Sequence, residues 1–236
     1  MKLKESRNPN IYYSFGNKHV SLRNVKSKLV NLTCSDEEID FSHLVLVEQT
    51  HSAEIKLIES ADLGSGFLDS KPEIPLVDGF VSNLPNVFLV IKTADCVPIL
   101  IYSKNTPAVG ACHSGREGTK NGIVKNLIRS MHSNFALAKT ELVVLVGPCI
   151  SGKNYQVDQA TFADFVLATG VEQENSTLDL QKVILRDILE LGILRENVHF
   201  SKHCTFTDDS YFSYRENKTT ERQLSIIGIK DGKIHK

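Results

Sequence analysis

Long apolar runs dominate the middle of this chain and indicate strands that are buried on both faces. Each run is bounded by Gly, Pro or polar residues, which is typical of buried strands rather than of surface helices. The strands expected from these runs are residues 44–47, 87–91, 97–102, 108–112 and 142–146. Weaker patterns of the same kind predict further strands at 11–15, 80–82, 198–200 and 224–229.

Three other segments repeat their apolar residues with the period of a helix. Each follows a residue that is common at helix N-caps, namely Thr119, Asp158 or Asp179. Gly170 and Gly192 are expected to end the second and third helices. The apolar stripes are Ile123, Val124, Leu127, Ile128 and Met131 in the first, Phe162, Phe165 and Val166 in the second, and Val183, Ile184, Ile188 and Leu191 in the third. These stripes predict core packing and need no functional explanation.

The predicted strands outnumber the helices and do not alternate with them regularly. This pattern favours an α+β fold of mixed, layered sheets with flanking helices over a doubly wound parallel sheet. A single domain over residues 1–236 accommodates it. Residues 61–75 are expected to form a surface loop, either a solvated connector or a lid over a site, and residues 35–40 a turn or a short helix.

Composition narrows the setting without naming a function. The net charge of −1 gives no bulk attraction for nucleic acid or for an anionic membrane, and the apolar runs are too short to span a bilayer. Five widely spaced cysteines argue against a disulfide framework, and the amino terminus lacks an apolar signal core. We therefore expect a cytoplasmic protein with reduced cysteines, as a monomer or a homodimer.

Chemically useful side chains interrupt or end the predicted strands. Asp95 and Cys96 separate two apolar runs, His113 follows a third run, and His51 comes shortly after a fourth. Two imidazoles and a thiol with one open position match a catalytic zinc site, whereas four ligands would indicate a structural one. The spacing matches no compact zinc motif, so the fold would have to assemble the site. Taken alone, His51 and His113 would be interpreted as structural or surface histidines, and Cys96 as a buried thiol.

Three charged residues are candidates for catalysis or binding. Asp95 could accept a proton or orient a ligand histidine, or it could simply cap a turn. In a regular strand Asp95 and Cys96 would face opposite sides, so a shared site requires a local kink. Arg215 and Arg222 could hold a phosphate, or they could form surface ion pairs.

A series of short blocks resembles the laccase-domain family, also described as multicopper polyphenol oxidase-like or purine nucleoside phosphorylase-like. No single block is decisive, but their order along the chain is specific. The blocks are Gln49-Thr-His51, Asp78-Gly-Phe-Val-Ser82, Thr93-Ala-Asp-Cys-Val-Pro98, His113-Ser-Gly115, Gly118-Thr119, Val146-Gly-Pro-Cys-Ile150, Cys204-Thr205, Phe212-Ser-Tyr-Arg215 and Arg222-Gln223.

The resemblance implies a zinc site at His51, Cys96 and His113 and a reaction of purine nucleosides with phosphate, with adenosine deamination as a related activity. It places catalysis near Cys96, Asp95 and Arg215. We rank copper below zinc, because three ligands cannot provide the several copper sites that multicopper chemistry needs.

The chain departs from the family pattern at charged positions. Arg116 and Glu117 stand where the family typically has Trp and Arg, and Arg116 becomes a candidate for substrate binding together with Arg222. Glu216 replaces a second arginine, and Glu221 replaces a glycine. These changes keep two other classes open: a cysteine-dependent hydrolase with Cys96 as nucleophile and His113 as base, and a catalytically weak binding or regulatory protein.

Overall fold

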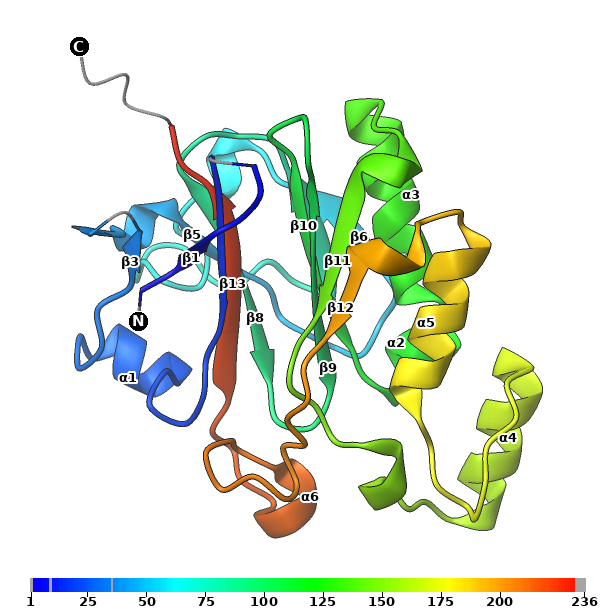
Figure 1. Cartoon of the computed structure of the whole chain (residues 1–236). Coiled ribbons are helices and arrows are strands. Elements are labelled where there is room, and N and C mark those ends of the chain that lie inside the picture. The colour runs from blue at the N-terminus through cyan, green and yellow to red at the C-terminus, as the bar shows by residue number, and fades with distance from the viewer. Residues whose placement is uncertain (1, 9, 35, 232–236) are drawn as a thin grey trace.

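A five-stranded sheet forms one side of the molecule. The computed structural model describes residues 2–8, 10–34 and 36–231 (Figure 1). In spatial order, this sheet contains β1 (Lys4–Glu5), β2 (Ile11–Phe15), β13 (Gln223–Ile229), β8 (Val87–Thr93) and β5 (Leu44–Leu46). Its strands pair antiparallel except β5, which pairs parallel to β8.

A six-stranded sheet packs against the first. Its spatial order is β12 (Val198–Phe200), β11 (Leu142–Val146), β9 (Val97–Ser103), β10 (Val109–Ser114), β7 (Gly79–Ser82) and β6 (Ile55–Leu57). The central pairs are antiparallel, and the two outer pairs are parallel. A small hairpin of β3 (Thr33–Cys34) and β4 (Glu37–Glu38) forms a separate two-stranded sheet.

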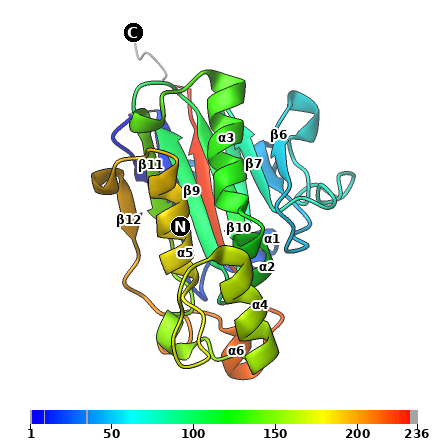
Figure 2. The ribbon, with the colours of Figure 1, turned by 90° about the vertical axis from the view of Figure 1, so that its right-hand side faces the viewer.

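Helices cover the outer face of the six-stranded sheet, as Figure 2 shows for α3 (Ile123–Phe135) and α5 (Leu180–Glu190). The other helices of the described residues are α1 (Leu22–Lys26), α2 (Arg116–Lys120), α4 (Gln159–Thr169) and α6 (Tyr214–Asn217). Short 3-10 turns lie at Phe41–His43, Ser60–Asp62, Lys139–Glu141, Gly152–Asn154 and Arg195–Asn197. On the opposite side, Val25 of α1 packs over the five-stranded sheet.

Burial on both faces explains the continuous apolar runs. Along β8, Leu89 and Ile91 pack between the two sheets, while Phe88 and Val90 pack toward the side of α1. Along β9 the same alternation sends Ile99 toward the helices and Leu100 toward the other sheet. Because successive strand residues point to opposite faces, a strand between two packed layers must be apolar at nearly every position.

The mixed layered fold predicted from the sequence is confirmed, and so are the helix starts after Asp158 and Asp179. Each of these carboxylates accepts a hydrogen bond from a backbone N–H in the first turn of its helix. Thr119, however, does not cap a helix. It lies inside the short helix α2, and α3 begins after Gly122, which has a left-handed φ of 72°. Gly122 allows this second start because glycine adopts positive φ without steric cost.

Two loop predictions need correction. In the 35–40 segment Asp36 lies in the expected turn, but residues 37–38 pair as a strand with 33–34, and Ser35 lies outside the described residues. The 61–75 segment is no solvated connector: it runs along β5 and buries Phe67. Its backbone bonds to β5 at Leu44 and Leu46. It therefore protects the edge of the five-stranded sheet.

Two connections cross from one sheet to the other at the same end of the molecule. The chain passes from β5 to β6 through His51, and from β8 to β9 through Cys96. His113 lies near the end of β10, opposite Pro98 of β9. The fold thus brings all three predicted metal ligands to the seam between the sheets.

No helix in the described part of the chain is both long and apolar enough to cross a bilayer.

The close contact between β13 and β8 supplies a test of the sheet packing. A Cβ atom at Gly228 would overlap the ring of Phe88 and the carbonyl oxygen of Val87. We expect Gly228→Ala to lower the free energy of unfolding by about 1–3 kcal/mol, the usual range for overpacking. Urea unfolding measures this change. The control Leu167→Ala, at a residue that is 86% exposed on α4, should stay within about 0.5 kcal/mol of the wild type. Equal stability of all three proteins would contradict the packing.

Candidate metal centre and its cavity

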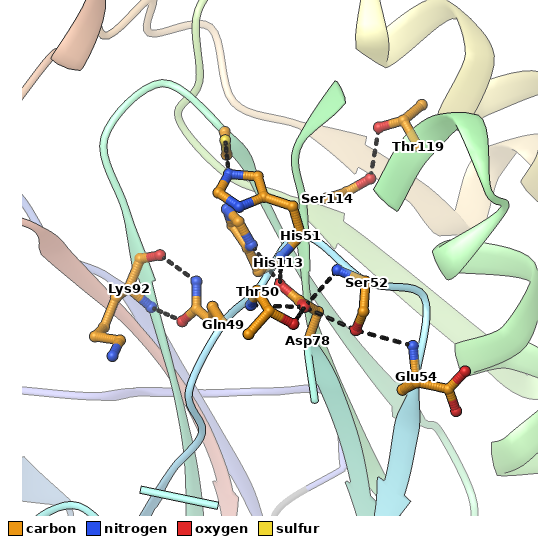
Figure 3. A network of polar contacts seen from close by, with 11 residues as sticks. Gln49, Thr50, His51, Ser52, Glu54, Asp78, Lys92, His113, Ser114 and Thr119 are labelled. Carbon is orange, nitrogen blue, oxygen red and sulfur yellow. Dashed lines mark hydrogen bonds and ion pairs between the residues drawn. The ribbon is translucent and has the colours of Figure 1, made fainter. Parts of the chain in front are cut away.

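One buried carboxylate assembles the loop that carries His51. Asp78 is fully buried and accepts hydrogen bonds from the backbone N–H groups of Thr50, His51 and Ser52 at 2.9, 3.0 and 2.7 Å (Figure 3). The Ser52 hydroxyl adds a further bond at 2.8 Å. These bonds hold His51 at a φ of 62°, which is uncommon for a residue other than glycine.

The same carboxylate orients the second histidine. Nδ1 of His113 lies 2.8 Å from Oδ1 of Asp78. Burial alone would raise the pKa of Asp78, but the hydrogen bonds from His113 and Ser52 outweigh it and lower the pKa to about 2. An ionised Asp78 accepts the proton of Nδ1, which leaves Nε2 of His113 as the atom available to a metal.

Cys96 lies between the two imidazoles. Its Sγ atom is 3.9 Å from Nε2 of His51, and the two imidazole rings are 4.8 Å apart, nearly edge to face. Burial would raise the pKa of the thiol, but His113 and His51 outweigh this effect and lower it to about 6. Burial would likewise lower the pKa of His113, but Cys96 and Asp78 raise it. The site therefore favours a thiolate, the form that binds metal.

The three donor atoms fit a metal ion. They lie within 4.8 Å of one another, and no other such group of His, Cys or acidic residues occurs in the described part of the chain. A tetrahedral zinc with bonds of about 2.0–2.3 Å holds its donors about 3.3–3.8 Å apart, which these side chains reach by small rotations. His113 is buried while His51 is exposed, so the fourth position would open toward solvent.

Asp95 provides the kink that the sequence required, but its contacts are structural. Its φ is 84°, and its two carboxylate oxygens accept hydrogen bonds from the Thr205 hydroxyl at 2.7 Å and from the backbone N–H of Arg215 at 2.6 Å. It thereby ties the C-terminal part of the chain to the loop that carries Cys96. These bonds engage both carboxylate oxygens in holding the structure. A role for Asp95 as a base stays a prediction.

All the predicted site residues line one cavity of about 1020 Å³ beside the three ligands. Its wall combines elements from distant parts of the chain. The lining includes Asp95, Cys96, His51, His113, Arg116, Arg215 and Arg222, together with Arg23, Lys26, Lys92, Lys218, Tyr155 and Tyr214. Seven Lys and Arg residues line the cavity against the three acids Asp95, Glu117 and Glu221. This excess of cations favours an anionic ligand.

Glu117 does not leave an unbalanced negative charge in the wall. Its carboxylate lies 3.0 Å from Nε of Arg116 and 2.7 Å from Nζ of Lys120. The hydrogen bonds from Lys120 and then from Arg116 lower its pKa, so it remains ionised. Of the two later departures from the family pattern, Glu216 is exposed and does not line the cavity, whereas Glu221 does.

The two predicted phosphate arginines are held by aromatic rings and backbone carbonyls. Arg215 lies over the ring of Tyr155 at 5.1 Å and donates to the carbonyl of Gln156. Arg222 lies over Tyr214 at 6.0 Å and donates to the carbonyls of Thr219 and Glu221. These contacts leave each guanidinium further N–H groups at the cavity wall. Their roles in substrate binding stay predictions.

The sequence alone did not indicate that Asp78 assembles the site, or that Lys92, Lys218 and Tyr155 line the cavity. Asp78 opens one of the family-like blocks, but its place in the sequence predicts no particular role in the site. Gln49, in another block, bonds both the backbone N–H and the carbonyl of Lys92, at 2.8 and 2.7 Å. Asp78 and Gln49 therefore both hold the His51 loop in place, and Gln49 also lines the cavity.

The chain is similar in sequence to proteins that are named purine nucleoside phosphorylases. It is 29% identical to the purine nucleoside phosphorylase YlmD of Bacillus subtilis, over 81% of this chain and 73% of that protein. It is 33% identical to a purine nucleoside phosphorylase of Campylobacter jejuni, over 65% of this chain and 67% of that protein.

Solved structures show the same fold. The crystal structure of YlmD from Geobacillus stearothermophilus superposes with a TM-score of 0.76 at 28% identity, covering 82% of this chain and 76% of that one. The protein YfiH of Bacillus licheniformis gives a TM-score of 0.78 at 23% identity over 93% of each chain. The model of one family also matches residues 13–230. The chain belongs to that family, which is described as multi-copper polyphenol oxidoreductase laccase.

Proposed function

We propose that this protein is a zinc-dependent purine nucleoside phosphorylase of the cytoplasm that acts on adenosine or inosine. The observation that carries the proposal is the His51–Cys96–His113 cluster at the wall of a cation-lined cavity. The names of the two relatives above supply the reaction class. Adenosine deamination stays a prediction that no contact in the cavity favours.

In this proposal the protein binds the two substrates side by side. Phosphorolysis joins a phosphate oxygen to C1′ of the sugar and breaks the bond from C1′ to the purine, which leaves with the bonding electrons. Arg116, Arg215 and Arg222 would hold the phosphate and balance its charge. A zinc ion at the cluster would supply a Lewis acid and would lower the pKa of a bound water.

The family description names copper, so copper is an alternative to zinc as the metal bound by these three donors. Two imidazoles and one thiolate also suit a single copper ion. Multicopper oxidation needs several copper ions, and the described residues hold one cluster of ligands. Zinc therefore remains the metal of this proposal, with copper as the alternative that metal analysis decides.

A cysteine-dependent hydrolase is the second candidate, since the Cys96 thiol has a pKa of about 6 beside two imidazoles. In that case Cys96 would attack the substrate and His113 would move the proton. In this second candidate Cys96 and His113 suffice as nucleophile and base, so His51 has no role. In the metal proposal His51 is the third ligand. Bound zinc would occupy the thiolate and exclude its use as a nucleophile.

Metal analysis tests the cluster directly. We expect about one zinc per chain in metal-replete protein and a loss of most of it in Cys96→Ala, because two imidazoles alone bind weakly. Inductively coupled plasma mass spectrometry measures the occupancy. Cys34→Ala, which lies outside the cluster, is the control and should keep its zinc. Full occupancy in Cys96→Ala would overturn the assignment.

A second test leaves every ligand in place. A Cβ atom at Gly115 would lie 2.7 Å from Cδ2 of His51 and 3.1 Å from Sγ of Cys96. We expect Gly115→Ala to push these two side chains apart and to weaken zinc affinity by ~10-fold or more, as changes next to ligands do. Competition with a chelating dye measures the affinity, and circular dichroism checks the fold. An unchanged affinity would show that the pair does not bind the ion.

Opposite changes at Arg116 and Glu117 test phosphate binding. If Arg116 contacts phosphate, Arg116→Met should raise the KM for phosphate roughly tenfold, equivalent to ~1.4 kcal/mol. Glu117→Gln should lower that KM, because it releases Arg116 and Lys120 from the carboxylate. The KM for the nucleoside should change little in both variants. Equal effects on the two KM values would indicate a structural role instead.

No release of purine base by zinc-loaded wild type at any phosphate concentration would refute the enzyme proposal.

A further inference from the structure

Two cysteines outside the metal cluster lie side by side beyond the parallel strands β11 and β12. Cys149 follows β11 and Cys204 follows β12, and the two residues form an isolated parallel β-bridge. The backbone N–H of Thr205 donates to the carbonyl of Cys149 at 3.0 Å. Neighbouring strands lie about 4.8 Å apart, and paired side chains share a face. This spacing falls within the Cα–Cα range of about 4.4–6.8 Å found in disulfides.

The two thiols have different surroundings. Cys204 is partly exposed, and its sulfur accepts hydrogen bonds from the backbone N–H of Ser151 at 3.3 Å and from Nδ2 of Asn154 at 3.4 Å. Burial would raise its pKa, but the bonds from Ser151 and Asn154 outweigh it and lower the pKa to about 6. Cys149 is buried, and burial raises the pKa of its thiol. Cys204 is thus the reactive partner, and Cys149 is the protected one.

Both cysteines precede residues that hold the Cys96 loop. The backbone N–H of Ile150 donates to the carbonyl of Asp95 at 2.9 Å, and the hydroxyl of Thr205 donates to the Asp95 carboxylate at 2.7 Å. Asp95 is the residue before the metal ligand Cys96. A covalent change at the cysteine pair therefore acts on two anchors of one loop, although neither cysteine lines the cavity.

We propose that Cys149 and Cys204 are a disulfide-forming pair that hydroperoxides oxidise. The Cys204 thiolate attacks the terminal peroxide oxygen and the O–O bond breaks. The leaving group is hydroxide from hydrogen peroxide or alkoxide from an organic hydroperoxide, and it takes a proton and departs as water or as the alcohol. The sulfur of Cys149 then attacks the sulfenic sulfur of Cys204. The S–S bond forms, the S–O bond breaks, and the hydroxide leaves as water with the proton of the Cys149 thiol.

The disulfide also couples oxidation to the metal site. To form the bond, Sγ of Cys204 must leave the donors Ser151 and Asn154 and turn toward Cys149, whose sulfur must leave Nε2 of Gln181 at 3.2 Å. Thr205 and Ile150 move with their neighbours and displace Asp95. The oxidised form then holds Cys96 less well and loses activity, a consequence that rests on the proposed phosphorylase function.

Peptide mapping tests the pair without reference to activity. Reduced, zinc-loaded full-length protein is treated with hydrogen peroxide, alkylated with iodoacetamide, digested and analysed by mass spectrometry. We expect a peptide pair linked through Cys149 and Cys204, two hydrogens lighter than its reduced parts and released by dithiothreitol. In Cys149→Ala the link disappears, and dimedone traps a sulfenic acid at Cys204. In Cys204→Ser the thiol of Cys149 stays reduced.

The buried Cys112 is the internal control, and it should react with iodoacetamide only after denaturation. Absence of the link in wild type, or oxidation of Cys149 in Cys204→Ser, would overturn the proposal. In the activity arm, peroxide should lower wild-type kcat/KM by ~10-fold or more and dithiothreitol should restore it, whereas Cys149→Ala should resist. An equal loss in Cys149→Ala would assign the damage to Cys96 and refute the coupling. An inactive wild type that still forms the link refutes the proposed function alone.

Discussion

The buried carboxylate of Asp78 is the interaction on which the site depends. It accepts hydrogen bonds from three consecutive backbone N–H groups of the His51 loop and fixes the tautomer of His113. A buried carboxylate is costly unless hydrogen bonds satisfy it, and here the cost is offset by donors that all belong to the site. One residue thus positions two ligands that lie far apart in the sequence. A change at Asp78 would disturb the loop and the imidazole together.

The second constraint is the way in which the chain changes sheets. Two connections cross the seam at the same end, and they carry His51 and Cys96 to the end of β10, where His113 lies. The strands around the seam are buried on both faces, so the seam is a rigid support. The segment between β12 and β13 forms part of the cavity wall at this end, and Asp95 bonds to it at Thr205 and Arg215.

Charge and redox chemistry meet at that same segment. Arg215 and Arg222 line the cavity, and the partly exposed Cys204 pairs with the buried Cys149. The cations of the wall attract an anion, while the hydrogen bonds around Cys204 stabilise a thiolate. Asp95 joins these two regions, because it bonds to Ile150 and Thr205, the residues that follow Cys149 and Cys204. In the proposed redox switch, Asp95 would connect the cysteine pair to the predicted metal ligand Cys96.

The sequence alone determined the strands of the two packed sheets, except β1 and β6, and the caps at Asp158 and Asp179, because burial on both faces and helix capping leave local patterns. Through the order of its family-like blocks it also indicated His51, Cys96 and His113 as ligands. Only the tertiary structure decided that Asp78 holds the site, that Glu117 is paired with Arg116 and Lys120, and that Thr119 lies within a helix. These facts depend on hydrogen bonds and ion pairs whose cost or gain is set by three-dimensional surroundings. No local pattern encodes them, because burial and the approach of distant segments exist only once the sheets have packed.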